Sequence, residues 1–193
     1  MTEVDGRAPR SPAEQHAAVA GVFTAKVDGV QDWAAPAPVP GWVARDVVAH
    51  LVEWMPGFLA GGGVTLTTDG PSVAEDPVAA WHAHTAAMQA LLDGPDAERE
   101  FPHPQAGTHP LNAAIDQFYT SDVFMHTWDL ARATGQDDRL DPEFCAVLLA
   151  GMEPWDQILR DSGQYGPRVP VPDDAPAQDR LAAFIGRDPA WRA

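Results

Sequence analysis

The sequence predicts an all-α protein, an up-and-down four-helix bundle with an extra short C-terminal helix and an extended, proline-rich tail. Apolar residues recur at helical spacing in four or five segments, and no segment alternates apolar and polar residues for long. Prolines and glycines are concentrated between these segments, where they separate one helix from the next. A length of 193 residues suits a single domain over 1–193, with loose residues at about 1–10 and a C-terminal extension, 164–193, packed on the bundle.

The first two helices have clear boundaries. Ser11 suits an N-cap position, and Glu14 completes a capping box, so the first helix is expected to run from there to about residue 32. A second helix is expected over 43–60. Pro56 should bend it, because proline removes a backbone donor inside the helix.

Three more helices and a short terminal one follow. A third is expected to begin near Pro77, a fourth to cover 110–134, and a fifth to cover 141–161 with a kink at Pro154. A short helix is expected near 177–185. The proline-containing stretch between the third and fourth helices is expected to be irregular, without strands.

The charge of the chain narrows its partners. Asp and Glu total 28 against 12 Lys and Arg, which gives a formal net charge of −16. The arginines are scattered and only one lysine is present, so no basic cluster could displace counterions from phosphate groups. We therefore expect neither nucleic acid nor a membrane as a partner. A homodimer is compatible with the sequence, although nothing in it specifies one.

Cysteine content and hydropathy predict a soluble, cytoplasmic protein. The single cysteine, Cys145, excludes an intrachain disulfide, and it is expected to be a buried residue rather than a nucleophile. The N-terminal residues lack the apolar run of a signal peptide. No stretch approaches the roughly 18 apolar residues that a membrane span requires.

The helix expected over 110–134 carries the residues that could do chemistry. At about 100° per residue, one narrow stripe of this helix holds three apolar residues followed by three ionisable ones. In chain order these are Leu111, Ile115, Phe118, Asp122, His126 and Asp129. A carboxylate that faces a core is costly to bury unless it is paired. The ionisable residues therefore need a partner: each other, water, an arginine or a metal ion.

Asp122 and His126 lie one helical turn apart, so both side chains can reach a common point, as when one helix supplies two ligands to a metal ion. The alternative is a plain hydrogen bond between them. His50 lies on the flank of the apolar face of the second helix, where it could instead be a satisfied core histidine. Taken together, the three residues form a ligand set that leaves open positions on Zn²⁺, Ni²⁺ or Fe²⁺.

Several motifs resemble those of a known family. Trp33 with Pro40-Gly41-Trp42, the segment 46–51 (Asp-Val-Val-Ala-His-Leu) and the segment 122–135, which begins Asp-Val-Phe-Met-His, are similar to markers of the DinB-like, mycothiol-dependent maleylpyruvate isomerase superfamily. The C-terminal segment 169–191 is similar to that of one uncharacterised bacterial subgroup, usually described as metal-binding. The resemblance extends over nearly the whole chain.

This resemblance implies a four-helix bundle with a metal ion, often zinc or nickel, near one end. The first ligand histidine of the family matches His50, and its pair of ligands four residues apart matches Asp122 and His126. The acidic ligand of the characterised isomerase is Glu, so the shorter Asp122 is a departure. We also expect the chain to lack that enzyme's separate C-terminal domain, and we do not transfer its reaction.

Four further residues are candidates around this site. Asp129 lies one turn beyond His126 and could orient that histidine through its other ring nitrogen. The alternative partners for Asp129 are Trp42, Trp54, Trp128 and Arg132. By position, the candidates for binding the carboxylates of a substrate are Arg45, Arg132 and Arg168.

The function expected from these features is that of a metal-dependent transferase or isomerase. It would use a low-molecular-weight thiol of the mycothiol type, activated on a divalent metal ion, together with a small electrophile. The alternative is a non-catalytic helical bundle that binds a metal or a small ligand. A third hypothesis is a protein–protein module in which the histidines are purely structural.

Overall fold

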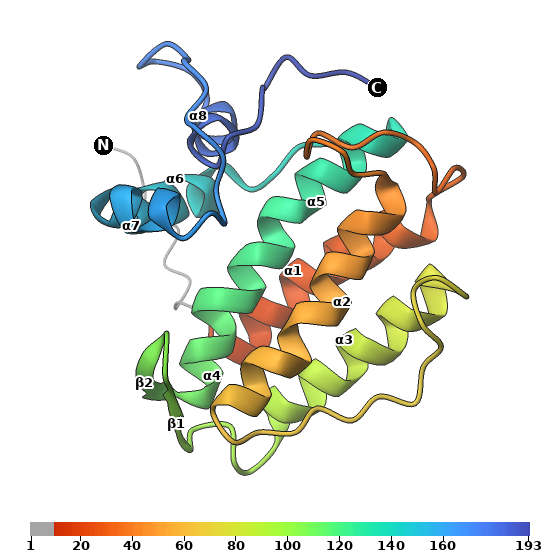
Figure 1. Ribbon diagram of the computed structural model, residues 1–193, viewed down its shortest axis with the longest axis vertical. Helices are drawn as coiled ribbons and strands as arrows, with labels where there is room; N and C mark the ends of the chain where they lie inside the picture. The colour runs from red at the N-terminus through yellow and green to blue at the C-terminus, as the bar shows by residue number, and fades with distance from the viewer. Residues whose placement is uncertain (1–9) are drawn as a thin grey trace.

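The computed structural model describes residues 10–193, which are mostly helical with one two-stranded sheet. Four long helices lie alongside one another (Figure 1): α1 (Pro12–Asp28), α2 (Ala44–Gly61), α3 (Pro77–Asp93) and α5 (Ser121–Thr134). Helices α1 and α2 each pack against both α3 and α5. The predominantly helical class is confirmed. The prediction of loose residues at the N-terminus concerns positions that lie, apart from residue 10, outside the described part of the chain.

Capping residues set the ends of these helices. The Ser11 hydroxyl accepts a hydrogen bond from the Glu14 N–H, and the Glu14 carboxylate accepts one from the Ser11 N–H at 2.8 Å, which completes the predicted capping box. Helix α1 ends at Asp28, a few residues earlier than expected. At the other end of the core, α5 stops at Gly135, whose φ of +66° is the left-handed conformation that glycine adopts without steric cost.

A π-helical segment, η1 (Ile115–Thr120), joins the short helix α4 (Leu111–Ala114) to α5 without a break. A π turn holds more residues than an α turn, so it changes which side chains face inward. Tyr119 and Thr120 are fully buried, while Phe118 is only half-buried. Leu111 and Ile115 are buried as the predicted stripe requires and Phe118 is partly buried against the core, while Asp122, His126 and Asp129 share one face of α5 as expected.

The stretch between α3 and α4 forms a β-hairpin, so the expectation of no strands is wrong. Strands β1 (Glu100–His103) and β2 (Gly107–Pro110) pair antiparallel. The His103 side chain accepts hydrogen bonds from two backbone N–H groups of the turn, those of residues 105 and 106. Four-residue strands that contain proline are too short for alternation to be visible in the sequence, and a histidine side chain stabilises the turn.

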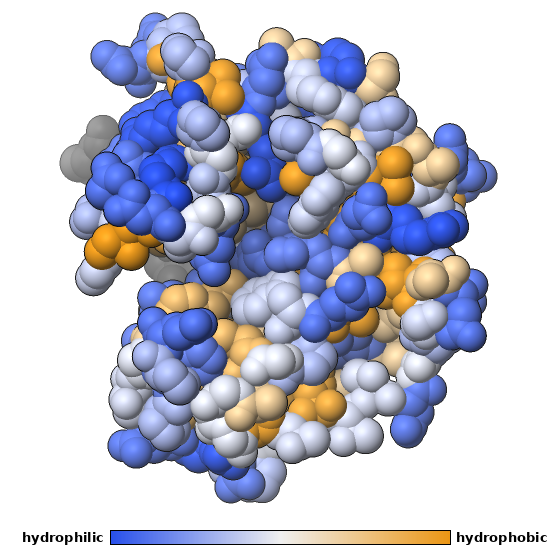
Figure 2. All heavy atoms as spheres, in the orientation of Figure 1, coloured by the Kyte–Doolittle hydropathy of each residue, from blue (hydrophilic) through white to orange (hydrophobic). Residues whose placement is uncertain are grey.

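The C-terminal helices form a separate layer beside α5 (Figure 1). They are α6 (Pro142–Met152), the 3₁₀ turn η2 (Glu153–Trp155), α7 (Asp156–Asp161) and α8 (Ala177–Phe184), and α6 packs against α8. The interruption at η2 contains Pro154, where a kink was expected. Figure 2 shows a largely hydrophilic face, with apolar residues scattered over it in small patches. The large apolar side chains exposed on the C-terminal layer are Val147, Trp155 and Ile158.

Within residues 10–193, none of the helices combines the length and the hydropathy needed to cross a membrane.

Candidate metal centre

His50, Asp122 and His126 converge where α2 packs against α5. Each residue offers one ligand atom, and these three atoms lie within 4.8 Å of one another. The hydrophobic face of α2, which includes the fully buried Val47 and Leu51, fixes its position on the core. His50 is placed beside that face as a result, directed toward α5.

The distances in this group suit a small divalent cation. His50 Nε2 lies 3.0 Å from one oxygen of Asp122, and His126 Nε2 lies 3.5 Å from the other. Ligand atoms that surround a tetrahedral ion at about 2.0–2.1 Å are about 3.3 Å apart. The donor set, two imidazoles and one carboxylate, is the type that Zn²⁺ and similar ions prefer. The residues present could therefore hold a divalent metal ion.

Asp129 contacts the ring nitrogen of His126 that does not face Asp122. Its oxygen Oδ2 lies 2.9 Å from His126 Nδ1, so this ring nitrogen donates to the carboxylate and Nε2 is left directed toward Asp122. Such a contact sets which nitrogen carries the proton and holds the plane of the ring. Asp129 is fully buried.

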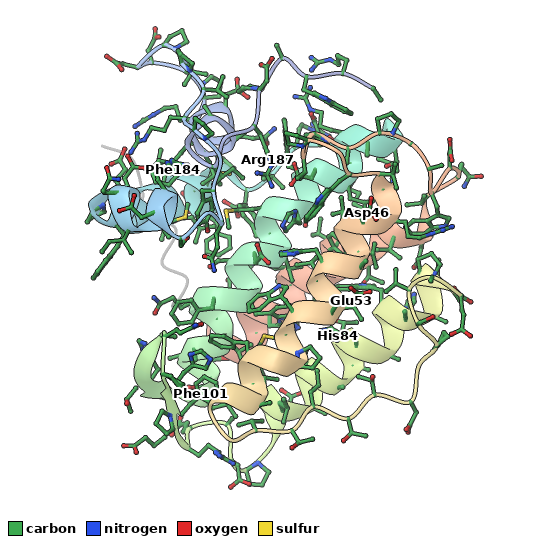
Figure 3. The ribbon with its side chains drawn as sticks, in the orientation of Figure 1. Asp46, Glu53, His84, Phe101, Phe184 and Arg187 are labelled. Atoms are coloured by element: carbon green, nitrogen blue, oxygen red, sulfur yellow. The ribbon has the colours of Figure 1, made fainter. Side chains whose placement is uncertain are left out.

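Arg187 balances the charge of Asp129. Its Nε lies 3.2 and 3.3 Å from the two Asp129 oxygens, and its Nη2 lies 3.1 Å from one of them. Nη1 donates to the Ile185 carbonyl at 3.0 Å. Figure 3 shows Arg187 between the C-terminal layer and the long helices. Of the partners considered for Asp129 from the sequence, neither a tryptophan nor Arg132 forms this contact.

Sequence reasoning missed Arg187 as a functional residue. It is separated from Asp129 by 58 positions, and no periodicity or motif links the two. The available signal was chemical: a buried carboxylate requires a cation, and an arginine stands in the segment Gly186-Arg187-Asp188-Pro189. Only the fold brings that segment onto α5.

Burial and charge act in opposite directions on the two carboxylates. Burial raises the pKa of Asp122, but the charge of His126 and the hydrogen bonds from His50 and Trp54 outweigh it, so the pKa of Asp122 lies below its ordinary value. Burial also raises the pKa of Asp129, but the hydrogen bond from His126 and the charge of Arg187 lower it by more, so this pKa too lies below its ordinary value. Both carboxylates are ionised at neutral pH, so Asp122 can act as a metal ligand while Asp129 stays paired with His126 and Arg187.

Two tryptophans form walls around the site. Trp54 Nε1 donates to Asp122 Oδ2 at 3.1 Å. The Trp42 ring is stacked on His126, with centroids 5.8 Å apart, and lies 5.3 Å from the His50 ring. A turn aims Trp42 at the site: the Trp42 N–H donates to the Val39 carbonyl, and Gly41 has the φ of +81° that the third position of a type II turn requires. The motif Pro40-Gly41-Trp42 thus places the Trp42 ring against the two histidines of the site.

The site opens on the side of His50. Its side chain is 34% exposed, against 19% for Asp122 and 6% for His126. Tyr165, from the loop after α7, is half-buried near this group. Burial and the charge of Asp122 raise the pKa of its phenol to about 12, so the hydroxyl stays protonated. Tyr165 is a second residue near the site that sequence reasoning did not single out.

Of the three arginines predicted to bind substrate, two are paired with carboxylates and one is exposed. Arg132 forms an ion pair with Asp138 and donates to the Trp191 carbonyl. Arg168 forms an ion pair with Asp156, at 3.1 Å. Arg45 is exposed in the first turn of α2.

Cys145 is fully buried, and burial together with the charge of Asp141 raises the pKa of its thiol to about 12. A thiol in this state is neither ionised nor accessible at neutral pH. It supplies no nucleophile to the site.

Comparison with known proteins places the chain among mycobacterial relatives. It is 30% identical over 154 residues to Uncharacterized protein MT0763 of Mycobacterium tuberculosis (strain CDC 1551 / Oshkosh) and, to the same extent, to Uncharacterized protein Rv0738 of Mycobacterium tuberculosis (strain ATCC 25618 / H37Rv). The match covers 79% of this chain and 83% of each relative. The chain belongs to their family. No family model and no solved structure matches it.

Proposed function

We propose that the protein is a metal-dependent transferase or isomerase that uses a low-molecular-weight thiol of the mycothiol type. The metal would be zinc or nickel, held by His50, Asp122 and His126 in a four-helix bundle of the DinB-like kind. One observation carries the proposal: the bond from His126 Nδ1 to Asp129, at 2.9 Å, directs Nε2 toward the carboxylate of Asp122. A simple Asp–His pair would have no need of a second, arginine-neutralised carboxylate behind it.

Three protein ligands leave room for a further ligand from outside. A divalent cation there would supply Lewis acidity and lower the pKa of a thiol that joins it. The side chains around it have other tasks. Asp122 balances positive charge, Asp129 and Arg187 hold the His126 ring, and Trp42 excludes water from one side.

The absence of an ionisable protein thiol supports a thiol substrate. The described residues include a single cysteine, Cys145, and it is buried and neutral. The nucleophilic sulfur would therefore come from a small molecule, with a small electrophile as the second substrate. The hydroxyl of Tyr165, which is protonated and close enough to respond to the charge of Asp122, would be a hydrogen-bond donor to a substrate at this site. We propose a cytoplasmic enzyme that needs neither nucleic acid nor membrane, and a homodimer is compatible with it.

The first test is elemental analysis of untagged protein beside His50→Ala and His126→Ala variants. We expect close to one metal ion per chain in the wild type and loss of it in both variants. His82→Ala is a matched control, because this exposed histidine pairs with Asp28 at 2.8 Å, away from the site. A wild type that takes up neither Zn²⁺ nor Ni²⁺ on incubation would overturn the metal site.

The second test is turnover. With a mycothiol-type thiol and candidate electrophiles, we expect metal-dependent loss of both substrates, abolished by a chelator and restored by the metal. Metal binding without any consumption of thiol would favour the alternative function.

That alternative is a non-catalytic protein that binds a metal or a small ligand. One observation favours it: Asp122 is shorter than the Glu of the characterised isomerase, and its oxygen Oδ2 is already within hydrogen-bond distance of both His50 and Trp54. A carboxylate that is satisfied without a metal is suited to weak, reversible binding.

A further inference from the structure

A second group of polar side chains is buried in the core, apart from the metal centre. It consists of His16 on α1, His84 on α3, and Tyr119 and Thr120 on η1. Their exposed fractions are 0%, 1%, 0% and 0%. We call these four residues the inner polar cluster. Figure 3 labels His84 among the long helices.

The cluster contains one hydrogen bond and several atoms without one. His16 Nδ1 lies 3.1 Å from the Thr120 hydroxyl. Four buried atoms have no partner among residues 10–193: His16 Nε2, both ring nitrogens of His84, and the Tyr119 hydroxyl. The Tyr119 ring connects the two histidines, with its centroid 5.7 Å from that of His16 and 5.6 Å from that of His84.

So many unpaired atoms in one place indicate a bound partner. Roughly 90% or more of buried polar groups in native proteins have a hydrogen-bond partner, which is either protein or ordered water. A lone exception can reflect strain, but the Tyr119 hydroxyl and three nitrogens of the two histidines beside its ring form one group. The described side chains provide nothing that could satisfy them.

The chemistry of the cluster selects the ligand. A neutral imidazole has one donor and one acceptor, and a phenol has both, so the ligand must donate and accept hydrogen bonds. Burial lowers the pKa of His16 and of His84 to about 4, so both rings are neutral, and burial keeps the Tyr119 phenol protonated. Neutral rings do not attract an anion. The cluster itself contains no carboxylate that would balance the charge of a cation.

We propose that the inner polar cluster is a binding site for ordered water molecules enclosed in the core. Water is small, neutral, and both a donor and an acceptor, and buried waters typically make about three hydrogen bonds each. Tyr119 also contacts Trp54, with centroids 5.9 Å apart, and Trp54 donates to Asp122. Trp54 therefore contacts both the inner polar cluster and the metal centre. This inference does not depend on the proposed function.

Tyr119→Phe is the sharpest test, because it removes a hydroxyl and keeps the ring. If water is bound, the variant deprives that water of a partner. We expect the unfolding equilibrium constant, measured by urea denaturation, to increase about 5- to 100-fold. If the cluster is dry, the variant removes an unsatisfied group, and the constant stays the same or falls. That result would overturn the proposal.

Two comparisons calibrate this test. Thr120→Val breaks the observed bond to His16, so it shows what the loss of one partner costs at this position. Met88→Leu, a conservative change at a fully buried apolar position on α3, should shift the constant by less than Tyr119→Phe.

A crystal structure and a metal analysis complete the experiment. We expect ordered oxygen density within about 3.2 Å of the Tyr119 hydroxyl or a His84 nitrogen. Well-ordered side chains without such density would overturn the proposal. A metal ion retained by the His50→Ala/His126→Ala double variant and lost on adding His84→Leu would also overturn it, by assigning the cluster to a metal.

Discussion

His126 and His84 are both nearly excluded from solvent, on neighbouring parts of the same core, but they have opposite surroundings. His126 lies between two carboxylates, Asp122 and Asp129, and the second of these is neutralised by Arg187. His84 faces a phenol, another histidine and apolar side chains. The fold thus holds one histidine group ready for a cation and keeps the other neutral. The residue type alone does not determine its chemistry.

The largest expected effect comes from removing the carboxylate that defines the first group. Asp129→Ala leaves Arg187 buried without its partner and His126 without its acceptor, so we expect the free energy of unfolding to fall by about 3–5 kcal/mol. Urea denaturation measures this. The milder Asp129→Asn should weaken metal binding about 10- to 100-fold in a titration.

Asp137→Ala is the matched control for that prediction. Asp137 also pairs with an arginine, Arg139 at 2.7 Å, but both side chains are exposed. Little change is expected from losing an exposed pair. If Asp129→Ala and Asp137→Ala lowered the free energy of unfolding equally, burial would not make the Asp129–Arg187 pair more important than the exposed pair.

Acid should destabilise the protein first through the inner polar cluster. The pKa of His16 and of His84 is lowered from 6.5 to about 4 in the fold, chiefly by burial. A lowered histidine pKa means that the unfolded chain binds the proton first, so stability decreases as pH falls from 6.5 to 4. Each histidine accounts for about 3 kcal/mol of this decrease.

A variant separates that decrease from the titration of carboxylates. Asp122 and Asp129, whose pKa values are lowered, contribute stability that is lost only as pH falls below about 3.8. His84→Leu should therefore flatten the dependence of stability on pH between 6.5 and 4 and leave the lower range unchanged. His82→Ala should change neither range. An unaltered slope in His84→Leu would show that His84 is not held neutral.

A smaller effect compares two tryptophan N–H groups with different acceptors. Trp54 donates to the charged Asp122, and Trp81 donates to the neutral Thr24 hydroxyl at 2.8 Å. Trp54→Phe should cost about 1.5–3 kcal/mol for the bond to a charged group, and this loss should shrink as Asp122 is protonated below pH 3.8. The loss in Trp81→Phe should not depend on pH. Urea denaturation of both variants at pH 7 and pH 3 provides the comparison.

The smallest expected effect concerns Cys145. Since burial raises the pKa of its thiol to about 12, a thiol-specific reagent at pH 7–8 should not label the native protein, and labelling should follow unfolding by urea. Rapid labelling of the native state would show that the Cys145 thiol is accessible and reactive. The protein would then have a nucleophile of its own, which would contradict the reason for proposing a thiol substrate.

Much of the fold was visible in the sequence because helices leave local signals. The capping box at Ser11, the glycine after α5 and the apolar spacing of α2 are patterns within a few residues. The ligand pair Asp122 and His126 was predictable for the same reason. His50 was inferred from its position on a second amphipathic helix, which is a weaker kind of evidence.

The features that the sequence did not reveal depend on contacts distant in the chain or on irregular backbone. Arg187 reaches Asp129 only through the docking of the C-terminal layer. The hairpin at 100–110 depends on a histidine side chain that completes its turn. The inner polar cluster was not predicted because its residues come from three separate elements, α1, α3 and η1, and no local pattern links them.

The π-helical segment η1 has a consequence for the length of the chain. In a regular α-helix each residue advances the side chains by about 100°, so deleting one residue turns everything beyond it. A π turn already holds more residues than an α turn, so a one-residue deletion within Ile115–Thr120 can be absorbed by a return to α-helical geometry, and Asp122 and His126 keep facing His50. Family members should therefore differ in length by one residue at this segment more readily than within α5.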